Sequence, residues 1–294
     1  MKTPQITYPE LAKAIGVKEL YLKREDLHPY GSHKGRSIPL MIKTYISQGN
    51  RDFVISSSGN AALAALFAVQ NHNNNNPSKR VKLQIFVGNH IDHQKLELLQ
   101  KELTDASITI EQHARPKQHA FQLAQQPGVV CLRQSTDDLA LEGYAELAQD
   151  ILKIPDLMAV FIPTSSGTAA QAIAETFLDT SSLPQVHIVQ TRACHPIANY
   201  FDTTQEKIGH SAAGAIVDQI AHRKASVINF IEQTHGSGWI PTEKQIQKAI
   251  DLIKKHTDID TITANGALGV AGLIKAKKEK HIFDGAVCCI VTGR

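Results

Sequence analysis

Lys34 is the residue in this sequence with the clearest chemical potential. Residues 21–23 read as a short strand, and a loop that contains proline and glycine follows it. Ser32 is then a candidate N-cap, which predicts Lys34 in the first turn of a helix. The positive end of a helix disfavours an ammonium group, so with some burial the pKa falls and the amine can form a Schiff base. An ordinary surface lysine fits the same short pattern, so the prediction depends on other segments.

A second segment with binding potential covers residues 56–60, which read Ser-Ser-Ser-Gly-Asn. It follows the apolar residues 53–55 and precedes the alanine-rich residues 61–69, a pattern that predicts strand, polar loop and helix. Backbone N–H groups at a helix start, together with serine hydroxyls, bind anions. The alternative is that these serines only cap the helix.

Residues 164–168 repeat this arrangement further along the chain. Residues 158–162 predict a buried strand, Thr-Ser-Ser-Gly-Thr forms the loop, and a helix is expected over 170–178. A loop of small residues that opens a helix is suited to a phosphate group. An ordinary turn between strand and helix has the same composition and remains the alternative.

Thr292, close to the end of the sequence, supplies a fourth candidate. Residues 286–291 predict a buried strand, and Thr292 and Gly293 follow it directly. Ligands of parallel α/β sheets gather at the carboxyl ends of the strands, so this hydroxyl is a candidate ligand contact. A threonine that only satisfies backbone groups at a strand end is the alternative.

Strands and helices that alternate along the chain must position these residues. Strands are predicted at 53–55, 81–87, 108–110, 129–132, 158–162, 186–189, 259–262 and 286–291, and helices at 94–103, 139–152, 246–253 and 268–277. This alternation predicts an α/β fold in which doubly wound domains contain mostly parallel sheets. The asparagine-rich residues 71–77 are expected to form a solvated surface loop.

Composition and charge exclude several functions. The net charge of +3 and the lack of basic runs interleaved with aromatics argue against a nucleic-acid partner. No HExxH motif or Cys/His cluster predicts a metal site, and the longest apolar run, residues 61–69, is too short to cross a membrane. The N-terminal residues lack the apolar core of a signal peptide. Four cysteines without a CxxC motif indicate free thiols and a cytoplasmic location.

The segment KREDLHPYGSHKGR, residues 23–36, resembles the cofactor-lysine segment of fold-type II pyridoxal-phosphate enzymes, the tryptophan synthase β superfamily. Its Gly-Ser-X-Lys-X-Arg pattern is nearest to threonine synthases and threonine dehydratases, and the resemblance extends from Thr3 to Gly293. It implies a tryptophan synthase β-like fold with two doubly wound domains. A small domain would cover residues 50–132, and a large pyridoxal-phosphate-binding domain would combine residues 1–49 and 133–294.

The resemblance also implies a role for each candidate residue. Lys34 would hold the cofactor, pyridoxal 5'-phosphate, as a Schiff base and would act in catalysis together with Ser58. The other implied contacts are Asn60 to the cofactor ring; Ser57, Ser58 and Gly59 to the substrate carboxylate; Thr164, Ser165, Ser166, Gly167 and Thr168 to the cofactor phosphate; and Thr292 to the pyridine nitrogen. A neutral hydroxyl at that nitrogen suits elimination and replacement chemistry.

Three features depart from the family pattern. Thr164 and Ser166 stand where glycines are common, and the lost glycines affect how closely the backbone can approach a phosphate. Thr263 stands where an acidic residue is common. The chain stops at Arg294, where relatives usually continue, so no appended regulatory domain is expected.

These observations favour a pyridoxal-phosphate-dependent lyase that acts on an amino acid by β/γ-elimination or replacement. The nearest activity is threonine synthase, which converts O-phosphohomoserine to threonine, and Arg36 is a candidate contact for the substrate's phosphate. A structural pair between Arg36 and Glu25 or Asp26 is the alternative. A threonine/serine dehydratase and a catalytically silent cofactor-binding paralogue are the other hypotheses. The chain is expected to form a homodimer. Its expected binding partner is a small-molecule amino-acid substrate.

Overall fold

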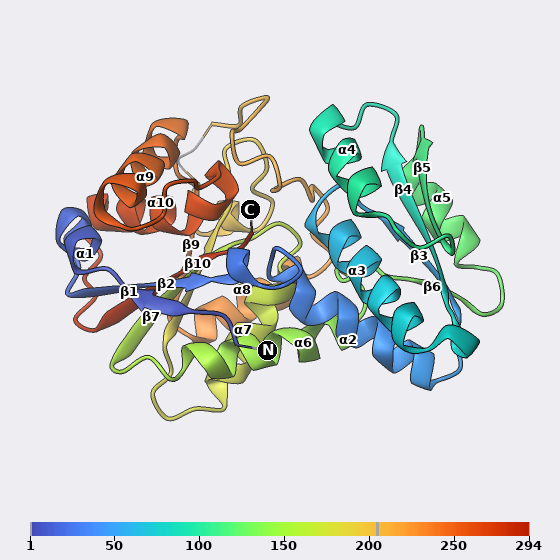
Figure 1. Cartoon of the computed structure of the whole chain (residues 1–294). Coiled ribbons are helices and arrows are strands. Elements are labelled where there is room, and N and C mark those ends of the chain that lie inside the picture. The colour runs from blue at the N-terminus through green and yellow to red at the C-terminus, as the bar shows by residue number, and fades with distance from the viewer. Residues whose placement is uncertain (1, 204–205, 294) are drawn as a thin grey trace. The chain divides into compact units, whose positions relative to one another are not determined.

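The structure, a computed structural model, describes residues 2–203 and 206–293. It divides into two compact units: unit 1 contains Met1–His28 and Tyr144–Arg294, and unit 2 contains Pro29–Gly143 (Figure 1). Arg294, at which the chain was expected to stop short of its relatives, lies outside the described residues. The domain boundaries expected at residues 50 and 132 stay a prediction.

Unit 1 contains a six-stranded sheet. The strand order is β1 (Gln5–Thr7), β2 (Glu19–Arg24), β10 (Ala286–Val291), β7 (Leu157–Pro163), β8 (Gln185–Val189) and β9 (Ser237–Trp239). Only β1 is antiparallel to its neighbour, and all other neighbours are parallel. The last strand, β10, lies between β2 and β7, with Cys289 opposite both Leu22 and Phe161. The carboxyl ends of β2, β10, β7 and β8 therefore meet at one edge of the sheet.

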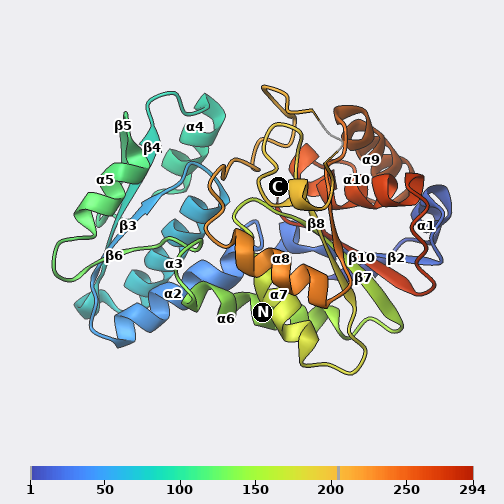
Figure 2. The same cartoon turned by 180° about the vertical axis from the view of Figure 1, so that it is seen from behind.

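Helices cover both faces of this sheet (Figures 1 and 2). One face carries α1 (Pro9–Ile15), α9 (Glu243–His256) and α10 (Ala264–Lys278), and the other carries α7 (Thr168–Leu178) and α8 (Lys224–Gln233). A capping box between Thr242 and Gln245 starts α9, which buries one apolar stripe. Because α10 lies between α9 and the sheet, it is buried around most of its circumference.

Unit 2 contains a fully parallel four-stranded sheet. Its order is β5 (Ile108–His113), β4 (Lys82–Gly88), β3 (Asp52–Ser56) and β6 (Val129–Cys131). The helices α2 (Lys34–Ser47), α3 (Asn60–Asn75) and α4 (His93–Glu102) bury apolar residues on one face, and α5 (Pro116–Leu123) packs on the other. A further helix, α6 (Leu139–Ile151), begins in unit 2 and ends in unit 1. The predicted α/β class with mostly parallel sheets is confirmed.

The structure corrects two sequence predictions. Residues 259–262 form no strand: Ile259 packs in the core of unit 1, but its neighbours lead without sheet pairing into α10. Most of the asparagine-rich run 71–77 is the last turn of α3 instead of a solvated loop. Asn73 is fully buried there, and its side chain exchanges two hydrogen bonds with the backbone of Val81, at 2.8 and 3.0 Å. Its amide also donates to Asp105 at 2.8 Å, which satisfies a polar group that the sequence pattern assigned to solvent.

Among the described residues, no helix is long and apolar enough to span a bilayer. All four cysteines are free thiols, as the sequence indicates. Cys288 and Cys289 are adjacent on β10 and both are buried. Burial raises the pKa of the Cys288 thiol to about 12, so it stays protonated and unreactive at neutral pH.

We predict that unit 1 loses stability in acid, because His187 on β8 is buried. Its buried ring stacks on Phe161, and its Nδ1 accepts a hydrogen bond from Trp239 Nε1 at 3.2 Å. Burial, with a smaller effect of His281, lowers the pKa of His187 from 6.5 to about 3. Between pH 6.5 and about pH 3, the unfolded chain therefore binds a proton at His187 that the folded chain does not bind. The stabilisation is fully present above pH 6.5 and falls by about 1.4 kcal/mol per pH unit as the pH approaches 3.

Urea unfolding at a series of pH values between these limits measures this effect. In the His187→Gln variant, the free energy of unfolding should fall less steeply with decreasing pH than in the wild type. Equal slopes in the two proteins would show that another group causes the acid sensitivity.

Candidate functional site

The predicted site residues occur in both units, and each set belongs to the start of a helix or the end of a strand. In unit 2, Lys34 is the first residue of α2, as predicted. Gly31 has a positive φ of 73° and turns the chain before the helix. The N-cap of α2 is His33 and not Ser32, which was the predicted N-cap. The Ser32 hydroxyl nevertheless accepts a hydrogen bond from the backbone N–H of Lys34 at 3.3 Å. Lys34 is half-buried and, as the first residue of α2, belongs to the positive end of the helix.

The start of α2 is held in place by α6. A Cβ atom added to Gly143 of α6 would lie 2.6 Å from both the Arg36 carbonyl oxygen and the Ser37 Cα. The two backbones can approach this closely only because residue 143 has no side chain. Arg36 and Ser37 are buried at this contact, next to Lys34 in the sequence. The glycine thus fixes the position of the turn that carries the candidate lysine.

The loop of residues 56–60 lies at the carboxyl end of β3, and Asn60 begins α3. Gly59 is the N-cap of α3 and has no side chain, while its N–H donates to Ser57 Oγ at 3.3 Å. The serines therefore do not cap the helix through their side chains, which removes the simpler interpretation of this segment. Ser57, Ser58 and Asn60 are half-buried. The helix start is available to an anion.

The starts of α2 and α3 lie at the same end of unit 2. Helices α2 and α3 pack against each other, and β3 runs back between them in the chain. The helices therefore run side by side in the same direction (Figure 1). Lys34 and Asn60 consequently stand at the same end of this helix pair. An amine and a hydroxyl-rich anion site are brought to one end of unit 2.

In unit 1, the candidates lie along the carboxyl edge of the sheet. Thr292 follows β10, and the loop 164–168 follows the neighbouring strand β7. Thr292 is buried, with 8 % of its surface exposed. The structure thus brings together two segments that are separated by more than a hundred residues in the sequence. This is the edge at which parallel sheets bind ligands.

Hydrogen bonds fix the loop 164–168 from both sides. The Thr164 hydroxyl donates to the Ile162 carbonyl at 2.8 Å, so this side chain completes the backbone of β7. Gln190, which follows β8, donates from its amide to the carbonyls of Thr164 and Ser165 at 3.2 and 3.4 Å. The hydroxyls of Ser166 and Thr168 are 3.0 Å apart. The loop is therefore preorganised before any ligand binds.

The backbone of this loop explains why Thr164 and Ser166 can replace glycine. Gly167, the N-cap of α7, has a φ of 91°, which is the left-handed region. Among the described residues of the loop, no other has a positive φ. A Cβ on Gly167 would also lie 2.6 Å from Val227 Cγ2. The one glycine that the geometry requires is present, so the two departures cause no backbone strain.

Thr263, the other departure, acts as the N-cap of α10. Its hydroxyl accepts from the Gly266 N–H at 3.2 Å. A Cβ on Gly266 would meet Val291 at 3.2 Å and the Gly293 carbonyl oxygen at 3.4 Å. The start of α10 therefore packs directly against the end of β10, next to Thr292.

Sequence reasoning missed a buried charged group at the end of β2. Arg24 donates to both carboxylate oxygens of Asp26, at distances of 2.8 to 3.2 Å. Glu25 is fully buried and accepts from the Thr3 hydroxyl. The pairing of Arg36 with Glu25 or Asp26, given as the alternative to a phosphate contact, stays a prediction. The charged run Lys-Arg-Glu-Asp, residues 23–26, was the signal in the sequence. A charged run of this kind predicts an exposed turn, whereas the structure buries all four residues.

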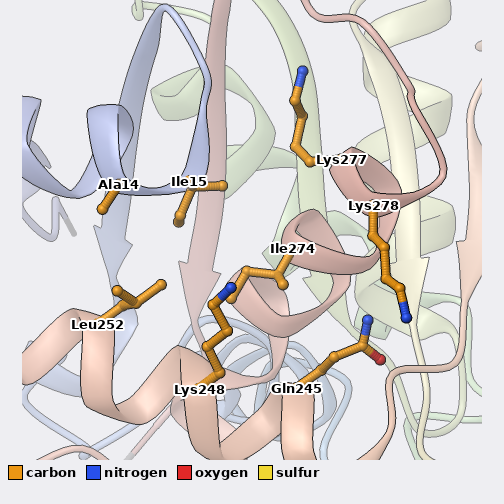
Figure 3. A pocket seen from close by; sticks show the side chains of 8 residues that line it. All are labelled: Ala14, Ile15, Gln245, Lys248, Leu252, Ile274, Lys277 and Lys278. Carbon is orange, nitrogen blue, oxygen red and sulfur yellow. The ribbon is translucent and has the colours of Figure 1, made fainter.

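A pocket of about 310 Å³ lies elsewhere on unit 1, toward the carboxyl end of α10. It is lined by Ala14, Ile15, Gln245, Lys248, Leu252, Ile274, Lys277 and Lys278 (Figure 3). The helix α10 has 15 residues, so this pocket is roughly 20 Å from Thr263 at the other end. It contains none of the predicted site residues. Among the described residues, no group of three or more His, Cys, Asp or Glu could hold a metal ion.

Comparison with known proteins agrees with this arrangement. The family model described as "Pyridoxal-phosphate dependent enzyme" matches residues 1–293. Threonine synthase from Methanocaldococcus jannaschii is 25% identical over 313 residues, which cover 99% of this chain and 74% of that protein. Human L-serine dehydratase/L-threonine deaminase is 30% identical over 156 residues, which cover 51% of this chain and 44% of that protein.

Solved structures share the fold at lower sequence identity. Maize serine racemase superposes with a TM-score of 0.83 at 15% identity, and covers 100% of this chain and 88% of its own. The processed threonine deaminase isoform 2 of Solanum lycopersicum gives a TM-score of 0.81 at 18% identity, with 100% and 84% coverage. These structural similarities establish the fold alone.

Proposed function

Because the chain belongs to the family of pyridoxal-phosphate-dependent enzymes, we propose that it is a lyase that eliminates or replaces a group on the side chain of a small amino acid. The activity that we favour is that of a threonine synthase. The supporting observation is the similarity to an archaeal threonine synthase, which extends over 99% of this chain and therefore includes every candidate residue. The Ala61-Ala62 pair after Asn60 agrees with that choice, since dehydratases usually carry a histidine after the asparagine.

The residues of the chain fit the cofactor. The start of α7, with Gly167 in the left-handed region and the hydroxyls of Ser166 and Thr168 beside it, offers N–H and O–H donors to a phosphate. Lys34 would supply an amine for the aldehyde, and Thr292 would supply a hydroxyl for the pyridine nitrogen. When bound, pyridoxal phosphate supplies an aldehyde that joins to amines and a conjugated ring that accepts electrons from a broken Cα–H bond.

Lys34 is the group that we assign to proton transfer. Its amine would take a proton from the substrate Cα and return protons to the carbon skeleton. Ser57, Ser58 and Gly59 would bind the substrate carboxylate through hydroxyl and backbone donors at the start of α3, and Ser58 would orient it for the reaction. Asn60 would hold the ring of the cofactor. Each role follows from a donor or an amine at the start of a helix.

Arg36 is the residue that we propose for the substrate's phosphate. A guanidinium group binds a phosphate through two parallel hydrogen bonds, so it would distinguish O-phosphohomoserine from unphosphorylated amino acids. Arg36 is 6 % exposed and follows Lys34 by two residues on the first turn of α2.

A threonine/serine dehydratase is the second candidate. The observation in its favour is the 30% identity to the human L-serine dehydratase/L-threonine deaminase. This identity is higher than the 25% to the threonine synthase, but it extends over a shorter segment. A dehydratase needs no contact for a substrate phosphate. It would release ammonia and an oxo acid from threonine or serine.

One titration distinguishes these candidates. Purified enzyme loaded with pyridoxal phosphate is mixed with O-phosphohomoserine, threonine and serine in turn, while the visible absorbance of the cofactor and the products are followed. A threonine synthase changes its spectrum with O-phosphohomoserine and releases phosphate and threonine, whereas a dehydratase releases ammonia from threonine or serine. If the cofactor binds and none of the amino acids changes the spectrum, the chain is a silent paralogue and the proposal is wrong.

We also propose that the protein is a cytoplasmic homodimer. The four free thiols, of which three are buried, are compatible with a reducing compartment. Sedimentation of the loaded enzyme would give the mass of two chains. A single-chain mass at micromolar concentration would contradict the dimer.

A further inference from the structure

Residues 211–218 of unit 1 form a segment without helix or strand, and side chains from other elements hold its backbone. Glu243 Oε2 accepts from the Ala212 N–H at 3.0 Å, and Asn265 Oδ1 accepts from the Ala215 N–H at 2.9 Å. Ser165 Oγ accepts from two N–H groups, those of Val217 at 3.1 Å and Asp218 at 3.2 Å. We call residues 211–218 the anchored segment.

The three anchors share a location. Glu243 is the first residue of α9, Asn265 is the second residue of α10, and Ser165 lies in the loop between β7 and α7. The start of α10 packs at the end of β10, and the Ser165 loop follows the neighbouring strand. The anchored segment therefore runs along the carboxyl edge of the sheet, where the candidate ligand contacts of unit 1 lie.

Both these hydrogen bonds and the packing of two side chains hold the anchored segment in place. Ala213 and Ile216 are buried in the core of unit 1, but Val217 has 59 % of its surface exposed. Because the Val217 side chain is mostly exposed, packing does not fix this residue. The hydrogen bonds to Ser165 hold the backbone of residues 217 and 218 instead. A hydroxyl oxygen has two acceptor lone pairs, and Ser165 uses both on these two N–H groups.

This changes the role of Ser165. Sequence resemblance assigns it to the cofactor phosphate, but its oxygen is engaged by the anchored segment, and only its O–H proton and its backbone remain for a ligand. One residue therefore links the candidate phosphate loop to a segment more than forty residues away in the sequence. A shift of the loop 164–168 would shift both N–H partners of Ser165 with it.

From these contacts we propose that the anchored segment is a single cooperative cover of the carboxyl edge, and that Ser165 and Asn265 are the positioning residues that hold it there. The proposal rests on the proposed function for its cofactor. The coupling is reciprocal, so cofactor bound at the loop 164–168 stabilises the segment, and a firmly anchored segment retains the cofactor.

Hydrogen exchange of the loaded enzyme tests the cooperativity without reference to activity. In Ser165→Ala, the amides of Ala212, Ala215, Val217 and Asp218 should all exchange at least about tenfold faster than in the wild type. The informative amide is that of Ala215, because Asn265 holds it and Ser165 does not touch it. If only Val217 and Asp218 exchange faster, the anchors are independent caps and the cooperative cover is wrong.

Matched variants complete the exchange experiment. Asn265→Ala should release the same four amides, and the double variant should exchange no faster than the more affected single variant, because a cooperative unit opens once. Ser182→Ala, an exposed serine of unit 1 outside every contact described above, should leave the exchange rates unchanged. Additive effects in the double variant would overturn the proposal.

Cofactor titration tests the reciprocal coupling. Asn265→Ala, which removes an anchor outside the loop 164–168, should weaken the binding of pyridoxal phosphate about tenfold. An unchanged affinity in this variant would overturn the coupling between the anchored segment and the cofactor loop. If no amino acid is turned over by the wild type, the proposed function fails, while the exchange result still decides whether the segment is one cooperative unit.

Discussion

We expect Lys34→Ala to abolish the visible absorbance of bound pyridoxal phosphate and to lower turnover by at least about 10³-fold. The reason is that we propose two roles for the amine of Lys34, to bind the aldehyde of the cofactor and to transfer protons on the substrate. Alanine favours the first turn of a helix, so the variant should fold with the stability of the wild type. Absorbance spectra after addition of the cofactor, together with initial rates, measure both effects.

Lys43→Ala is the matched control for this variant. Lys43 lies on the same helix, is exposed, and has no role in the proposed site. Its spectrum and rate should equal those of the wild type. Small primary amines added to Lys34→Ala should restore part of the turnover, since they supply a mobile proton acceptor. An unchanged cofactor spectrum in Lys34→Ala would contradict the assignment of this lysine.

The second large effect is expected for Gly143→Ala. The new methyl group would lie 2.6 Å from the Arg36 carbonyl oxygen and the Ser37 Cα, which are backbone atoms that cannot rotate away. Overpacking of this kind costs about 3 kcal/mol of unfolding free energy, because α6 and the start of α2 must separate. The displacement would also move Lys34, so the affinity for pyridoxal phosphate should fall. Urea unfolding and cofactor titration measure the two consequences.

Glu142→Ala tests whether the effect comes from this contact. Glu142 is the neighbouring residue of α6 and is exposed, so its replacement should change the unfolding free energy by less than about 0.5 kcal/mol. If Gly143→Ala is as stable as Glu142→Ala, the close approach of α6 to α2 is not needed for the fold. If it is destabilised and yet binds the cofactor normally, the contact does not position Lys34.

The candidate segments could be identified from sequence because each contains its signal locally. Lys34 follows a loop with a glycine and precedes an apolar helix, and the loops 56–60 and 164–168 are short runs of small polar residues between a strand and a helix. Periodicity and composition detect such runs. Most of the strands and helices around them were predicted for the same reason, but β1, β9, α1, α5 and α8 were not predicted.

The errors have a common physical cause. The run 71–77 was assigned to solvent because asparagine is polar, yet Asn73 is buried by hydrogen bonds to residues 81 and 105 that local sequence does not reveal. Residues 259–262 were assigned to a strand because isoleucine is β-branched, yet Ile259 reaches the core from an irregular segment. In both cases long-range contacts override a local preference.

The amino-acid sequence by itself determined the alternation of strands and helices, the family resemblance, the candidate lysine and the hydroxyl-rich loops, because these depend on residues close together in the chain. Only the tertiary structure decided that β10 lies between β2 and β7, which puts Thr292 beside the loop 164–168. It also decided that, within the loop 164–168, Gly167 is the residue that needs a left-handed conformation, and that Ser165 holds residues 217 and 218. These facts depend on the pairing of distant strands and on hydrogen bonds between distant segments, which no local pattern encodes.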